Sequence, residues 1–182
     1  MKVSLKARID RIFYVEGGVL RTKDYLNYVA AGNGQNLSYA LVVGYLNIFY
    51  TDILRVDPTI VGTMFLISKL IDAFTDILMG TVIDKTRTKW GKMRPYLLIA
   101  PIPLAIINTL LFVAPDISYA GRIAYMYVTY LLWDIAYTMS DVPYWSLASV
   151  LSPHHQERTK IVNFARIGTG VGIVLPISTV HL

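Results

Sequence analysis

The stretch YLNYVAAGNGQNLSYALVVGYLNIFYT, residues 25–51, contains no Asp, Glu, Lys or Arg. A second uncharged stretch, PYLLIAPIPLAIINTLLFVAP, covers residues 95–115. Each is longer than the roughly 20 residues that a helix needs to cross the hydrocarbon core of a bilayer. The composition agrees, since 54% of the residues are hydrophobic and 16% are charged, whereas soluble domains average about 45–50% and about 25%. The sequence therefore predicts a membrane protein.

Five segments are apolar enough to be predicted as transmembrane helices, and they cover residues 25–50, 59–83, 95–114, 123–150 and 161–182. We expect helices because a helix pairs its own backbone groups, for which lipid offers no partner. Residues 25–182 then form a membrane bundle. Residues 1–24 are expected to be a cytoplasmic leader, either an amphipathic helix on the inner leaflet or an unstructured end.

The distribution of basic residues predicts the orientation of the chain. Thirteen Lys and Arg lie before the first predicted span, between spans two and three, and between spans four and five, whereas the other two connections hold only Arg55 and Arg122. Because an excess of Lys and Arg marks the cytoplasmic side, we expect a cytoplasmic N-terminus and a multi-pass protein of the cell membrane. This distribution also accounts for the net charge of +5 without a nucleic-acid surface.

Ionisable side chains inside predicted spans are costly and usually mark a transport pathway. The sequence has six of them: Lys69, Asp72, Asp76, Asp134, Asp141 and Arg166. Lys69, Asp72 and Asp76 have helical i, i+3 and i+7 spacing, which puts them on one face with one negative charge in excess. A small cation, Na⁺ or H⁺, would neutralise this excess, and Thr75 could add an oxygen ligand. The alternative is that these charges only pair with one another and with neighbouring helices.

The fourth predicted span carries Tyr137, Thr138, Asp141 and Trp145 within two and a half helical turns. An aromatic ring can cover the apolar face of a sugar while a carboxylate accepts hydrogen bonds from its hydroxyl groups. We therefore expect a sugar site here, and Arg166 could either contribute donors to it or pair with Asp141. The alternative for the two aromatic residues alone is an interfacial aromatic belt.

Three motifs resemble those of a known family. They are FYTD with VGTMFL and DAFTD at residues 49–76, GTVIDKTRTKWGKMRP at residues 80–95, and DVPYWS at residues 141–146. Together they resemble the glycoside–pentoside–hexuronide:cation symporters of the major facilitator superfamily, whose best-known members are the melibiose permeases. The resemblance covers about residues 23–180.

The resemblance implies a fold of twelve helices in two six-helix halves, of which this chain would hold five helices of the N-terminal half. It implies that Asp72 and Asp76 bind the coupling cation with Thr138. By the same resemblance, Tyr137, Asp141, Trp145 and Arg166 would line the sugar site. Two departures stand out: Gln35 and Asn36 replace a Lys-Asp pair at the sugar site of melibiose permeases, and Thr75 replaces an Asn at the cation site. We include Asn36 in the expected sugar site, and Lys69 as the residue that balances the charge.

The sequence thus predicts a cation-coupled symporter of a small sugar or glycoside, with Na⁺ or H⁺ as the coupling ion and no cofactor. With only five spans, we expect a truncated N-terminal part that lacks its C-terminal half and is inactive alone. An alternative is a sugar-binding membrane subunit, or a remnant, that does not transport. An enzyme is not expected because the chain has no Cys and no recognisable nucleophile–base pair or metal cluster. The motifs give no role to Asp134.

Overall fold

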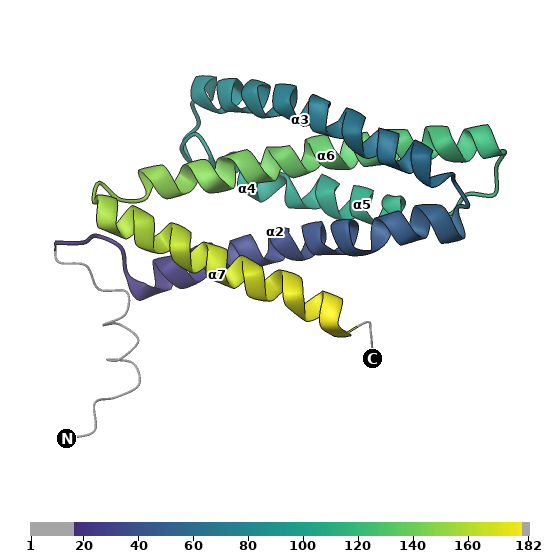
Figure 1. Cartoon of the computed structure of the whole chain (residues 1–182). Coiled ribbons are helices and arrows are strands. Elements are labelled where there is room, and N and C mark those ends of the chain that lie inside the picture. Colours follow the sequence, from purple (N-terminus) through teal and green to yellow (C-terminus); the bar gives the residue numbers. More distant parts are fainter. Residues whose placement is uncertain (1–16, 180–182) are drawn as a thin grey trace. The chain divides into compact units, whose positions relative to one another are not determined.

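The computed structural model describes residues 17–179, with side chains up to residue 170, and every regular element among these residues is a helix (Figure 1). The helices are α2 (Thr22–Ile48), the π-helix η1 (Phe49–Ile53), α3 (Pro58–Lys85), α4 (Arg94–Ile99), α5 (Pro101–Leu111), α6 (Tyr119–Val150) and α7 (His155–Thr179). The predicted all-helical class is therefore confirmed for this part of the chain. Most of the predicted leader, residues 1–16, lies outside the described residues.

Within residues 17–179, each predicted span coincides with helix, but the ends and continuity differ. The third predicted span is divided at Ala100 into α4 and α5, because Pro101 and Pro103 provide no N–H for the helical ladder. Among residues 17–179, no helix combines the length and the mean hydropathy required of a membrane span. The five transmembrane helices thus stay a prediction.

The chain divides into two compact units, each described here by itself. The terminal unit comprises residues 1–37 and 145–182, and the central unit comprises residues 38–144. The central unit contains the end of α2, all of α3 to α5 and most of α6. The terminal unit contains the start of α2, the end of α6 and α7.

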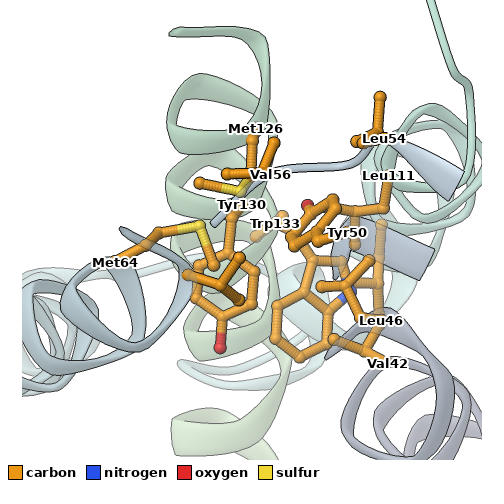
Figure 2. Packing of buried hydrophobic residues seen from close by; sticks show 13 residues of the cluster. Val42, Leu46, Tyr50, Leu54, Val56, Met64, Leu111, Met126, Tyr130 and Trp133 are labelled. Carbon is orange, nitrogen blue, oxygen red and sulfur yellow. The ribbon is translucent and has the colours of Figure 1, made fainter. Parts of the chain in front are cut away.

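The core of the central unit is a cluster of buried apolar and aromatic side chains (Figure 2). It draws on α2, η1, α3, α5 and α6, and its members are Val42, Leu46, Tyr50, Leu54, Val56, Val61, Met64, Leu104, Leu111, Met126, Tyr130, Trp133 and Ala136. Figure 1 shows α3 running alongside α6, and Phe65 of α3 packs edge-to-face on Tyr130 of α6 with ring centroids 5.1 Å apart. This packing fixes which faces of the two helices meet.

A buried carboxylate organises the terminal unit. Glu157, only 1% exposed, accepts hydrogen bonds from the Val19 N–H at 3.1 Å and the Leu20 N–H at 3.0 Å. The Ser152 hydroxyl also donates to it. Burial by itself would raise the pKa of Glu157, but the hydrogen bonds from Ser152, Leu20 and Val19 hold that pKa below its ordinary value. Glu157 therefore ties the segment before α2 to the start of α7.

Further along the terminal unit, α7 approaches α2 closely at a glycine. A Cβ atom added to Gly168 would lie 2.6 Å from Val29 Cγ1 and 3.1 Å from Asn33 Nδ2. Tyr25 of α2 also packs edge-to-face on Phe164 of α7, with ring centroids 6.3 Å apart. The absence of a side chain at Gly168 thus permits this helix–helix contact.

We predict that Gly168→Ala destabilises the chain, whereas Gly170→Ala stabilises it. The added methyl group at position 168 would lie 2.6 Å from Val29 Cγ1. Because a β-branched side chain has little rotamer freedom in a helix, relieving this clash should cost about 1–3 kcal/mol. Position 170 has nothing within 4 Å, so alanine there gains only its helix propensity of about 0.5–1 kcal/mol. Thermal unfolding followed by circular dichroism distinguishes the two. Equal shifts in Tm would contradict the close contact.

We also predict that Glu157→Gln costs about 1–3 kcal/mol at neutral pH, since hydrogen bonds to a charged group are replaced by weaker ones. Because the pKa of Glu157 is lowered in the folded state, its contribution to stability is present above the ordinary pKa of about 4.5 and is lost as the pH falls through the folded value. The difference in Tm between the wild-type chain and Glu157→Gln should therefore shrink in acid. A pH-independent difference would disprove this role.

Candidate functional site

The central unit contains a cavity of about 510 Å³ between α2, α3 and α6, which we call the acidic cavity. Its lining consists of Tyr39, Val43, Asn47, Phe65, Lys69, Asp72, Asp76, Tyr130, Trp133, Asp134, Tyr137, Thr138 and Asp141. Four carboxyl groups and one ammonium group lie among these side chains, a formal excess of three negative charges when all are ionised. The cavity is therefore suited to a positively charged occupant.

The α3 wall of the acidic cavity carries an ion pair. Lys69 Nζ lies 2.6 Å from Asp72 Oδ2, and the Asp72 side chain is 21% exposed whereas that of Lys69 is 67% exposed. Asp76 lies one turn further along the same face and also lines the cavity. Lys69 thus compensates Asp72, while no ion pair in the described part of the chain includes Asp76.

The α6 wall carries the carboxyl group that the motifs did not explain. Asp134 is 5% exposed, and the Ser68 hydroxyl of α3 donates to its Oδ2 at 2.5 Å. Asp134 also interacts electrostatically with Asp72 and Lys69. Because a buried carboxyl group needs a hydrogen-bond partner, this contact links α3 to α6.

Aromatic side chains form a continuous cluster along one side of the cavity. Trp133 stacks on Tyr137 with ring centroids 5.2 Å apart and on Tyr39 at 6.3 Å. Tyr39 and Tyr137 are themselves 5.3 Å apart, and Tyr130 lies 5.7 Å from Trp133. Trp133 is buried, while Tyr39 and Tyr137 are partly exposed, so the two tyrosines are the ring surfaces that an occupant could reach.

Six of the residues predicted for the site meet in this cavity: Lys69, Asp72, Asp76, Tyr137, Thr138 and Asp141. Thr75 is not among the lining residues. Its hydroxyl instead donates to backbone carbonyls of its own helix, those of Asp72 at 3.1 Å and Ile71 at 3.2 Å. A hydroxyl that donates keeps its oxygen lone pairs, so the oxygen contribution expected from Thr75 stays a prediction.

The other predicted sugar-site residues, Asn36, Trp145 and Arg166, belong to the terminal unit. The Asn36 amide donates to the Gly32 carbonyl at 2.8 Å, Arg166 is exposed, and Trp145 lines a separate cavity of that unit. Their joint action with Tyr137 and Asp141 stays a prediction.

Sequence reasoning missed Tyr39, Phe65, Tyr130 and Trp133, and it gave Asp134 no role. A signal was present, because Tyr130, Trp133, Tyr137 and Asp141 follow the i, i+3, i+7, i+11 spacing of one helical face. Because apolar residues occur on every face of the predicted spans, this aromatic face does not stand out when the charged residues are considered first.

The cavity lining combines carboxyl groups, which suit a small cation or a proton, with aromatic rings. Carboxylate oxygens are hard ligands that suit such cations, and tyrosine rings offer a flat surface beside hydrogen-bonding groups. Within residues 17–170, no three His, Asp or Glu side chains converge tightly enough to hold a metal ion.

Comparison with known proteins gives one family and several relatives. The family described as MFS/sugar transport protein matches residues 27–179. The chain is 38% identical to the isoprimeverose transporter of Lactiplantibacillus pentosus over 81% of the chain and 30% of that protein. It is 39% identical to the putative glycoside/cation symporter YagG of Escherichia coli over 76% and 30%, and 34% identical to the glucuronide carrier protein homolog of the same organism over 90% and 35%. The chain thus spans about a third of the length of these relatives.

We predict that Ser68→Ala and Asp134→Ala each destabilise the chain by about 1.5–3 kcal/mol. Each substitution removes one group of a buried, charge-assisted hydrogen bond and leaves the other group without this partner. The double variant should cost at least about 0.5 kcal/mol less than the sum of the two single variants. Denaturant unfolding measures all three. Asp84→Asn is the matched control, because the Asp84 side chain is 82% exposed and 3.8 Å from Lys92, and it should change stability by less than about 0.5 kcal/mol. Strict additivity would show that the two groups do not cooperate.

Proposed function

Because the chain belongs to the MFS/sugar transport protein family, we propose that it supplies the cation site and part of the sugar site of a cation-coupled sugar symporter in the cell membrane. One observation carries this proposal: carboxyl groups of α3 and α6 line the same cavity as a cluster of aromatic rings. Relatives named as transporters, symporters or carriers support the transport of a solute in preference to its chemical conversion.

In the proposed cation site, Asp72 and Asp76 hold Na⁺ or H⁺ with Thr138 as a neighbour from α6. All three line the acidic cavity. Lys69 neutralises one carboxylate through its 2.6 Å ion pair, so a single further positive charge is stabilised by the charges that are left. Without that cation, the carboxylates repel one another and oppose the approach of α3 to α6.

In the proposed sugar site, the partly exposed rings of Tyr39 and Tyr137 cover the apolar face of a sugar, and Asp141 accepts hydrogen bonds from its hydroxyl groups. Asn36, Trp145 and Arg166, which belong to the terminal unit, remain separate candidates for contacts with the sugar. Two relatives are named for isoprimeverose and for a glucuronide, which are therefore the sugars to test first.

The mechanism couples the two sites through the helices that they share. A cation that neutralises α3 allows α3 and α6 to hold their cavity in shape, which raises the affinity for sugar. By linkage, sugar must then raise the affinity for the cation by the same factor. Alternating access in transporters of this kind needs two halves that move against each other around the substrate. We therefore propose that these residues transport a sugar only together with a second half, which corresponds to the part of the relatives that the chain does not match. The N-terminus is proposed to face the cytoplasm.

We predict that vesicles accumulate labelled isoprimeverose or glucuronide in response to a Na⁺ or proton gradient. The vesicles contain the protein encoded by the longest natural reading frame that includes these residues. Asp72→Asn should weaken the stimulation of sugar binding by the cation more than about tenfold, because a unit charge at about 4 Å contributes about 4 kcal/mol at an effective dielectric constant of about 20. The control Asp84→Asn, outside the cavity, should leave stimulation unchanged.

Two outcomes would count against the symporter. Accumulation that is independent of both gradients would refute cation coupling. Sugar binding without accumulation in any gradient would favour the second candidate, a membrane subunit that binds a sugar and does not carry it.

A further inference from the structure

A second cavity, which we call the basic cavity, lies in the terminal unit where α6 ends and α7 begins. It measures about 410 Å³ and is lined by Trp145, Ala148, Ser149, His155, Arg158, Thr159, Val162 and Asn163. One guanidinium and one imidazole group lie in this lining, and no carboxyl group does. The basic cavity thus has the charge opposite to that of the acidic cavity, and it is not explained by a cation site.

Arg158 is incompletely satisfied within the part of the chain that the structure describes. Its Nη1 donates to the Ser149 carbonyl at 3.4 Å, a long contact. Its Nε is buried and has no hydrogen-bond partner there, and neither ion pair of the described residues includes Arg158. Leaving a buried donor of a charged group without an acceptor is unfavourable, so Arg158 is suited to an acceptor other than those of the described residues.

The acidic side chain next in sequence does not supply that acceptor. Glu157 directs its carboxylate to Val19, Leu20 and Ser152, and it does not line the basic cavity. The hydroxyl groups of Ser149 and Thr159 already donate to backbone carbonyls. The donors left to a ligand are therefore the Arg158 guanidinium, the His155 ring and the Asn163 amide, while Trp145, Ala148 and Val162 form an apolar wall.

We propose that the basic cavity binds a phosphate group. Three donor side chains around one cavity suit a tetrahedral oxyanion, whose several oxygens accept from more than one direction. The planar guanidinium group is the side chain best matched to phosphate, and the apolar wall can cover the organic part of a phosphate ester. The phosphate comes either from a phospholipid headgroup or from a water-soluble compound. The predicted cytoplasmic position of the α6–α7 connection favours neither source over the other.

This proposal is independent of sugar transport, so it is tested on the purified full chain without a transport assay. Inorganic phosphate is titrated into the chain in a neutral detergent and followed by ³¹P NMR line broadening. In parallel, the chain is reconstituted into vesicles of phosphatidylcholine alone or with phosphatidylglycerol, and retained lipid is quantified by native mass spectrometry. Binding of inorganic phosphate identifies a soluble ligand, and selective retention of phosphatidylglycerol identifies a lipid headgroup.

We expect Arg158→Gln to weaken whichever binding is found by at least about tenfold, and Asn163→Ala to weaken it severalfold. Arg87→Gln makes the same change of charge at an exposed residue outside the cavity and should have no effect. If Arg158→Gln lacks the helical circular dichroism of the wild-type chain, His155→Ala replaces it, again with a severalfold loss expected. Failure of the wild-type chain to bind either probe, or equal loss in the Arg158 and Arg87 variants, would overturn the proposal.

Discussion

Placing several carboxyl groups inside a bundle of largely apolar helices is the constraint on which the central unit depends. A buried charge without a partner costs several kcal/mol, so the helices must approach each other in the one register that provides partners. Ser68 donates to Asp134 across the α3–α6 contact, and the next residue of α3, Lys69, pairs with Asp72. Two adjacent residues of α3 thus serve two acidic groups on different helices. The aromatic cluster of Tyr39, Trp133 and Tyr137 lines the same cavity as these groups.

The spacing of residues within one predicted helix correctly indicates which side chains share a face. The positions of Lys69, Asp72 and Asp76 predict a shared face, and all three line the acidic cavity. The resemblance to the glycoside–pentoside–hexuronide:cation symporters is confirmed by the family match and by relatives named as symporters and carriers. Spacing does not reveal which neighbouring helix approaches a face, so the contact of Ser68 with Asp134, 66 residues further along the chain, could not be foreseen. Spacing likewise does not reveal that the Thr75 hydroxyl donates to carbonyls of its own helix.

The terminal unit is stabilised by other interactions than the central unit. Its helices meet where a glycine removes the steric barrier, and its loops are tied by the buried carboxylate of Glu157, which accepts from two consecutive backbone N–H groups. Small residues favour close contacts between membrane helices, as Gly168 does where α7 meets α2. The sequence did not indicate Glu157, because a glutamate in a polar connection is ordinarily a solvated side chain. Only the fold brings the segment at residues 19–20 to that carboxylate.

The chain contains one acidic and one basic cavity, and in each of them charges of one sign predominate. In the central unit, the basic member of the lining is already paired, so acidic groups dominate the field that an occupant meets. In the terminal unit the opposite holds, because the nearest carboxylate in sequence is consumed by backbone N–H groups and leaves Arg158 available. In each case the residue whose charge is opposite to that of the cavity, Lys69 or Glu157, is already bound by a partner within the chain and does not neutralise the other charged residues of the cavity. The sign of each site is therefore determined by which charges the fold satisfies internally, and the net charge of +5 of the whole chain predicts neither.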